Sequence, residues 1–188
     1  MLSDFQTRKL SYLFTIYDHN RNGLLELDDF TDIAEQICDK LGYKAGSRHH
    51  EDLLRKTVRL FHHLMSEMPN IKGQRITDND WINYFDTKIV SHHDEDLLVE
   101  YIEMMIGYLF DLFDFNNDGY ISLDEYKDIF DIYGINRDYA EKAFHNLDLN
   151  SDGKLSRYEL VRAIETFLIS DDPLMKGNWI FGNWDSPL

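Results

Sequence analysis

The sequence holds one cysteine and three prolines among 188 residues, and it has no long apolar run. A lone cysteine, Cys38, excludes a disulfide framework and fits a reducing compartment. Few prolines leave room for long helices. No stretch approaches the roughly 20 apolar residues that cross a bilayer. Because MLSDFQTRKL has neither a signal-peptide core nor a myristoylation glycine, we expect a cytoplasmic protein without a lipid anchor.

Basic side chains are also scarce. The chain carries 19 Lys and Arg against 35 Asp and Glu, which gives a formal net charge of −16. A field of that sign repels phosphate backbones, so we expect no nucleic-acid partner, and it attracts cations. Hydrophobic residues make up 43% of the chain and aromatic residues 14%, which excludes overall disorder. The length fits one moderate domain or two small ones packed together.

Three segments share one twelve-residue pattern. Asp stands first, Asn third, Asn or Asp fifth, Gly sixth, an aliphatic residue eighth and an acid twelfth. Apolar residues at spacings of three and four flank each copy, which places them on one helical face. This is the pattern of an EF-hand calcium loop between two helices. The copies read DHNRNGLLELDD (18–29), DFNNDGYISLDE (114–125) and DLNSDGKLSRYE (148–159).

The loop positions predict the ligands of Ca²⁺, which takes about six to eight oxygens. Side chains at positions one, three, five and twelve and the carbonyl at position seven should bind directly, and Ser122 and Ser156 at position nine through water. The predicted ligands in the two later loops are Asp114, Asn116, Asp118, Tyr120 and Glu125, and Asp148, Asn150, Asp152, Lys154 and Glu159.

The first loop differs at its end. Asp29 stands where a bidentate Glu is usual, and its side chain is one methylene shorter. Fewer oxygens and a smaller cage suit Mg²⁺, so we expect a Ca²⁺ site that tolerates Mg²⁺. Glu26, at position nine, could bind directly or through water. The predicted ligands here are Asp18, Asn20, Asn22, Leu24 and Asp29.

A fourth hand is needed because one hand cannot bury its apolar faces alone. Aligning the aliphatic eighth position on Ile76 places this hand's loop at 69–80, PNIKGQRITDND. Pro69, Ile71 and Gly73 then occupy positions one, three and five and offer no carboxylate. We interpret this hand as structural and without metal, which predicts three Ca²⁺ per chain. Short β-ladders should join Leu25 to Ile76 and Ile121 to Leu155.

The predicted fold is all-α: four EF-hands in two pairs, at 1–90 and 94–169, followed by an aromatic tail at 170–188. We place the joint between the pairs at 91–94. The tail residues Trp179, Ile180, Phe181 and Trp184 are too apolar to remain in water together, so the tail should pack on the two halves and keep the molecule compact. Helices are expected at 3–17, 27–41, 49–68, 78–90, 94–113, 123–133, 138–147 and 157–169.

With the hands placed, the chain resembles the sarcoplasmic calcium-binding protein and calexcitin group. The resemblance lies in LSDFQTRKL, in IYDHNRNGLLELDDF and in KGNWIFG near the C-terminus. That group has a compact four-hand form, a degenerate second hand, an aromatic tail, and in some members an Asp closing the first loop. The resemblance implies a cytosolic Ca²⁺ buffer, with a role in calcium signalling proposed for calexcitins.

Other functions remain open at this stage. A calcium-dependent sensor or adaptor would bind a target helix, and a carrier of the luciferin-binding type would hold a small aromatic ligand among residues such as Trp81 and Tyr84. No Ser/His/Asp or Cys/His nucleophile arrangement can be argued, so we expect no enzymatic activity. We expect a monomer whose main partner is Ca²⁺, with a protein target left open.

Overall fold

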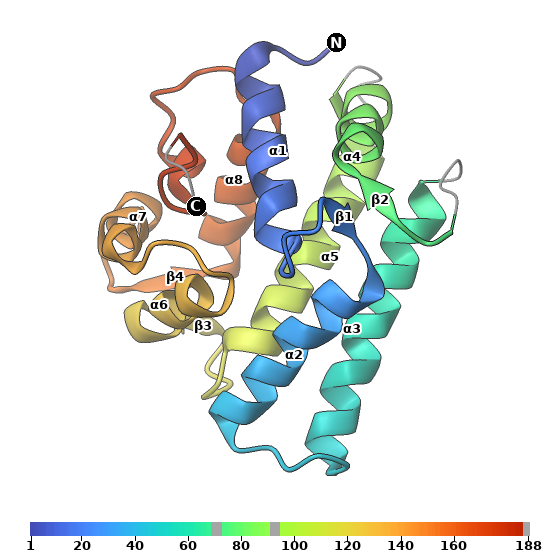
Figure 1. The fold of residues 1–188 in the computed structure, drawn as a ribbon. Helices are drawn as coiled ribbons and strands as arrows, with labels where there is room; N and C mark the ends of the chain where they lie inside the picture. The colour runs from blue at the N-terminus through green and yellow to red at the C-terminus, as the bar shows by residue number, and fades with distance from the viewer. Residues whose placement is uncertain (69–72, 91–94, 186–188) are drawn as a thin grey trace.

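The computed structural model describes residues 1–68, 73–90 and 95–185. Helices in that part of the chain form four helix–loop–helix hands (Figure 1). The joint expected at 91–94 lies outside the described residues. In order, the helix pairs of hands 1 to 4 are α1 (Asp4–Tyr17) and α2 (Leu27–Leu41), α3 (Arg48–Glu67) and α4 (Asp78–Tyr84), α5 (Glu95–Phe113) and α6 (Leu123–Ile132), and α7 (Ala140–Leu147) and α8 (Arg157–Ile169).

The expected helix 78–90 is not a single α-helix. After α4 the chain continues as a π-helix, η1 (Phe85–Val90). Trp81, Phe85 and Ile89 recur every four residues, and all three are buried. A wider turn keeps this four-residue spacing on one face better than a turn of 3.6 residues does. The described residues also form two short 3₁₀-helices, η2 (Arg137–Tyr139) before α7 and η3 (Lys176–Trp179) in the tail.

Short antiparallel ladders join the loops of each pair, as predicted. Strand β1 (Leu24–Leu25) pairs with β2 (Ile76–Thr77), and the register places Leu25 opposite Ile76. Strand β3 (Tyr120–Ser122) pairs with β4 (Lys154–Ser156), and Ile121 lies opposite Leu155. All four of these aliphatic side chains have no exposed surface, so each ladder is anchored in the core.

The same helix contacts occur within both pairs. Helix α2 packs against α3 and α1 against α4, while α6 packs against α7 and α5 against α8. Contacts of α1 with α8, α2 with α6 and α3 with α5 join the two pairs (Figure 1). Aromatic contacts also join the pairs: Tyr17 meets Tyr133 edge-on at 6.2 Å between ring centroids, and Phe85 meets Tyr101 edge-on at 5.2 Å. Among the described residues, no helix is long and apolar enough to cross a membrane.

The C-terminal tail packs onto the hands, as predicted. Ile180 and Phe181 are buried. Their carbonyl oxygens accept hydrogen bonds from Tyr126 on α6 (2.5 Å) and from Tyr12 on α1 (2.8 Å). Helix η3 lies against α7 and α8, and a Cβ atom added at Gly177 would lie 2.6 Å from Cβ of Thr166. The tail therefore contacts hands 1, 3 and 4.

A buried lysine fixes the start of the tail. Lys9 on α1 has no exposed surface. Its ammonium group donates to the carbonyl of Ser170 (2.8 Å) and to Oδ1 of Asn178 (2.9 Å), and it lies 4.7 Å from the ring centroid of Phe5. Desolvation lowers the pKa of Lys9 to about 8, although nearby Asp171 raises it. The cation thus links α1 to the end of α8 and to η3.

The lowered pKa of Lys9 predicts a pH dependence. Because the folded pKa is about 8 and the ordinary value is 10.5, the cost of burying the charge is fully present below pH 8 and is relieved as the pH rises toward 10.5. The shift corresponds to about 3 kcal/mol. The wild-type protein should therefore gain stability relative to Lys9→Met between pH 7 and 9.5, as measured by urea unfolding of both proteins. A constant difference across this range would contradict the assignment.

Candidate metal centres

The end of each predicted loop also begins the exiting helix. Ser122 and Ser156, at loop position nine, are the N-cap residues of α6 and α8. Glu125 and Glu159, at position twelve, are the third helical residues and complete a capping box with them. The closing carboxylate accepts the backbone N–H of the N-cap serine, and the serine hydroxyl accepts the N–H of the third helical residue, which would otherwise have no partner. This local requirement holds Glu125 and Glu159 at the loops.

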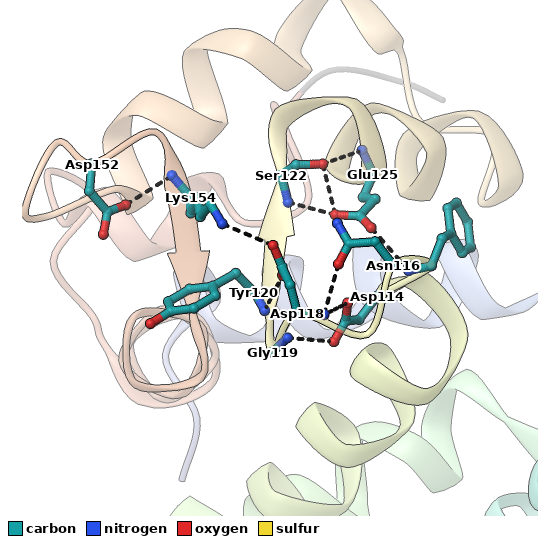
Figure 2. Close-up of polar contacts among 10 residues, drawn as sticks. Asp114, Asn116, Asp118, Gly119, Tyr120, Ser122, Glu125, Asp152 and Lys154 are labelled. Atoms are coloured by element: carbon teal, nitrogen blue, oxygen red, sulfur yellow. Dashed lines mark hydrogen bonds and ion pairs between the residues drawn. The ribbon is translucent and has the colours of Figure 1, made fainter.

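The loops of hands 3 and 4 share one hydrogen-bond scaffold. In hand 3 the first-position Asp114 accepts N–H bonds from Asp118 at 3.0 Å and from Gly119 at 2.9 Å (Figure 2). The Asn116 side chain accepts a second bond from the Asp118 N–H at 2.7 Å, and Asp118 accepts one from Tyr120 at 3.0 Å. The corresponding bonds of hand 4 are those of Asp148, Asn150, Asp152, Gly153 and Lys154.

Hand 1 repeats this scaffold with its shorter closing residue. The Gly23 N–H donates to Asp18 at 2.8 Å, and the Leu24 N–H donates to Asn22 at 2.8 Å. Asp29 is fully buried and accepts N–H bonds from Asn20 (3.2 Å) and from Glu26 (2.9 Å). The side chain of Asn20 also accepts the Asn22 N–H. The five predicted residues therefore lie in one hydrogen-bonded loop. Asp29 reaches N–H groups of that loop although its side chain is one methylene shorter than that of Glu.

The second hand has a different turn. Pro69 and Ile71, which would occupy ligand positions one and three, lie outside the described residues. Gly73 and Gln74 follow one another with φ of +78° and +56°. In the other hands, left-handed residues alternate at positions four and six: Arg21 and Gly23, Asn117 and Gly119, and Ser151 and Gly153. The described part of the second loop therefore keeps the ladder but not the turn of the other three.

The donors in hands 1, 3 and 4 suit a hard cation. They are carboxylate, amide, carbonyl and hydroxyl oxygens, which favour Ca²⁺ or Mg²⁺ over softer metals. In the described parts of the chain, no three His, Cys, Asp or Glu side chains are already gathered as a metal-ion cluster. The loop oxygens accept the N–H bonds given above. The residues fit Ca²⁺ by chemistry and loop position, and their ligand roles stay a prediction.

Burial and hydrogen bonding shift the acidity of the closing residues in opposite directions. Desolvation is the main cause of a raised pKa at Asp29, and it outweighs N–H bonds from Glu26 and Asn20. Desolvation also acts on Glu159, but hydrogen bonds from Ser156 and from the loop N–H groups together leave its pKa lowered. The closing carboxyl group therefore has a raised pKa in the first hand and a lowered pKa in the fourth.

Two cationic side chains in the loops were not foreseen from the sequence. Lys154 was assigned only a carbonyl ligand, yet its Nζ lies 2.9 Å from Oδ2 of Asp118 in the neighbouring hand (Figure 2). Arg75 occupies the same loop position in the second hand, and its Nε lies 2.7 Å from Oε1 of Glu26. The sequence did carry a signal: both even-numbered hands have a basic residue at position seven.

Comparison with known proteins identifies EF-hand relatives. The family model of the EF-hand domain pair matches residues 103–165. Clytin from Clytia gregaria is 30% identical over 181 residues, which cover 92% of this chain and 86% of clytin. Calerythrin from Saccharopolyspora erythraea is 26% identical over 167 residues, covering 89% of this chain and 94% of calerythrin.

Solved structures show the same fold. The crystal structure of the photoprotein clytin, 27% identical, has a TM-score of 0.69 and covers 97% of this chain and 95% of its own. An amphioxus sarcoplasmic calcium-binding protein, 15% identical, has a TM-score of 0.74 with both chains fully covered. The fold and the loops define an EF-hand protein. The chain belongs to the EF-hand calcium-binding protein family.

Proposed function

We propose that this protein is a cytoplasmic, monomeric calcium buffer that binds three Ca²⁺ in the loops of hands 1, 3 and 4. The observation that carries the proposal is the hydrogen-bond scaffold repeated in those three loops, from the first-position Asp to the sixth-position Gly. The twelfth-position carboxylate closes each loop. Mg²⁺ should compete with Ca²⁺, most strongly in hand 1, because Asp29 supplies a shorter closing side chain.

Several features support buffering over sensing or catalysis. A sensor exposes an apolar groove when it binds Ca²⁺. Here Ile180 and Phe181 of the tail are buried against the hands, so a target helix would have to displace them. Cys38 is a free, buried cysteine, in keeping with a reducing compartment. The matched family is defined by calcium binding, and we propose a binding protein with no enzymatic activity.

Calorimetric titration tests the number of sites. Ca²⁺ added to the wild-type protein should give three sites, and millimolar Mg²⁺ should weaken the hand 1 site most. Glu125→Gln and Glu159→Gln should each reduce the stoichiometry by one, because the amide removes half of the bidentate carboxylate. Glu141→Gln on the exposed surface of α7 is the matched control and should keep three. Four sites in the wild-type protein would overturn the reading of the second hand.

A carrier of a small aromatic ligand is the second candidate, favoured by the likeness to the photoprotein clytin. The residues nominated to line such a cavity pack closely here: the Trp81 indole N–H donates to the Leu10 carbonyl at 3.0 Å, and its ring lies 4.9 Å from that of Phe85. This packing supports the buffer. The absorption spectrum of protein purified without denaturant decides the matter, since a bound chromophore absorbing above the tryptophan band would favour the carrier.

A further inference from the structure

The side chain of Lys154 crosses from the loop of hand 4 to the loop of hand 3. Its Nζ donates to Oδ2 of Asp118 at 2.9 Å and lies 5.0 Å from the ring centroid of Tyr120. Figure 2 shows the amine between the two loops, with Asp152 on its own side and Asp118 on the other. Asp118 is the fifth-position residue whose carboxylate a Ca²⁺ ion in hand 3 would need. A cation of the protein therefore already contacts a predicted Ca²⁺ ligand.

The ladder between β3 and β4 determines on which face Lys154 lies. Its register places Lys154 opposite Ser122 and places Ser156 opposite Tyr120. Because side chains alternate along a strand, Lys154 shares a face with Tyr120. The aliphatic part of Lys154 can follow that ring toward Asp118, while the intervening Leu155 faces the core and is fully buried. The backbone pairing thus places Lys154 on the face of the ladder from which its amine reaches Asp118.

The first pair of hands repeats the arrangement. Arg75 stands at the seventh position of the hand 2 loop, and its Nε lies 2.7 Å from Oε1 of Glu26 at position nine of the hand 1 loop. In both pairs, the second hand therefore presents a cation to an acidic residue in the loop of the first. The two contacts share position and charge although Lys and Arg differ in shape.

We propose that Lys154 is a tethered competing cation that weakens Ca²⁺ binding in hand 3 and makes it depend on the loop of hand 4. The proposal rests on Ca²⁺ binding in hands 3 and 4. The loops of these hands have the same predicted donors: Asp, Asn, Asp, a carbonyl, Ser and Glu. Among the described residues, only in hand 3 does a lysine of the neighbouring loop contact the carboxylate at the fifth position. The divalent ion must either displace that ammonium group or share Asp118 with it.

The size of the effect follows from exposure. The side chains of Lys154 and Asp118 are 46% and 37% exposed, so solvent screens their attraction. Exposed ion pairs of this kind change an equilibrium constant by no more than about fivefold. Lys154→Met should therefore tighten Ca²⁺ binding in hand 3 by about two- to fivefold. Hand 4 should change little, because its ligand from residue 154 is a backbone carbonyl.

Backbone amides report on each hand separately. The Gly119 N–H donates to Asp114, and the Gly153 N–H donates to Asp148, so an ion bound to either carboxylate polarises its own glycine amide. Ca²⁺ titration of ¹⁵N-labelled full-length protein, followed by these two NMR signals, gives a midpoint for each hand. In Lys154→Met the Gly119 midpoint should fall, while the Gly153 midpoint stays near its wild-type value.

Two matched variants separate a contact from a general change of charge. Lys127→Met removes one positive charge from α6, beyond the loop of hand 3, and should leave the Gly119 midpoint unchanged. Lys154→Arg keeps a cation at the same place and should restore weak binding. Thermal melting in EDTA is an independent readout: Lys154→Met should melt lower than wild type, because Asp118 loses its cation among the other loop carboxylates.

The two glycine signals separate a failure of the Lys154 proposal from a failure of Ca²⁺ binding in hand 3. A wild-type Gly119 signal that ignores Ca²⁺ would overturn Ca²⁺ binding in hand 3 itself. A Gly119 signal that responds with the same midpoint in wild type and Lys154→Met would leave calcium binding intact and overturn the role of Lys154. Equal shifts in Lys127→Met and Lys154→Met would likewise overturn it, since only net charge would then matter.

Discussion

Saturating Ca²⁺ should raise the free energy of unfolding by about 4 kcal/mol for each occupied hand when free Ca²⁺ is near a thousand times Kd. The effect is large because the ions bind only the folded loops and because the chain carries a formal charge of −16. Three Ca²⁺ ions bring six positive charges and would change that charge to −10. Each loop also holds two or three predicted carboxylate ligands whose mutual repulsion the ion relieves.

Chemical unfolding in excess Ca²⁺ and in EDTA measures this gain. Glu125→Gln, which should lose one site, should show about two thirds of the wild-type increment. Sodium chloride at matched ionic strength is the control, because it screens the loop charges without entering the loops. If the free energy of unfolding is the same in Ca²⁺ and in EDTA, the loops do not bind Ca²⁺ as proposed.

The sequence was informative wherever structure depends on a local pattern. Position eight of each loop predicted the partners in both ladders, and the register of Leu25 with Ile76 followed from alignment alone. This prediction was correct because each loop has an aliphatic residue at a fixed distance from its glycine. Pairing these residues across the ladder buries both of them in the core. The expected helix start at residue 123 was also correct, because Ser122 caps α6 there and Glu125 completes the capping box.

Prediction failed where a side chain meets a distant partner. Lys154 was predicted only to offer its backbone carbonyl, because its contact with Asp118 depends on how two loops are aligned. Lys9 belongs to an ordinary amphipathic helix in the sequence, and only the returning tail buries it against Asn178. The π-helix at Phe85 was missed for a related reason, since the four-residue spacing of Trp81, Phe85 and Ile89 fits an α-helix nearly as well.

Removal of residues 174–188 should destabilise the protein by several kcal/mol and expose apolar surface. Burying Ile180 and Phe181 stabilises the fold by about 1.5–3 kcal/mol each. The deletion also removes the carbonyl groups that accept from Tyr12 and Tyr126 and leaves those buried hydroxyls without these partners. Thermal melting should show the loss, and binding of a hydrophobic dye should rise.

Point variants show whether the tail acts through its buried side chains. Phe181→Ala should cost about 3–5 kcal/mol, because the ring packs edge-on against Phe167 at 5.1 Å. Leu174→Ala is the matched control: this apolar residue of the same tail is 87% exposed and should change stability little. If truncation leaves both the melting temperature and dye binding unchanged, the tail does not close the hands. Closure would then no longer argue against a sensor that opens to a target helix.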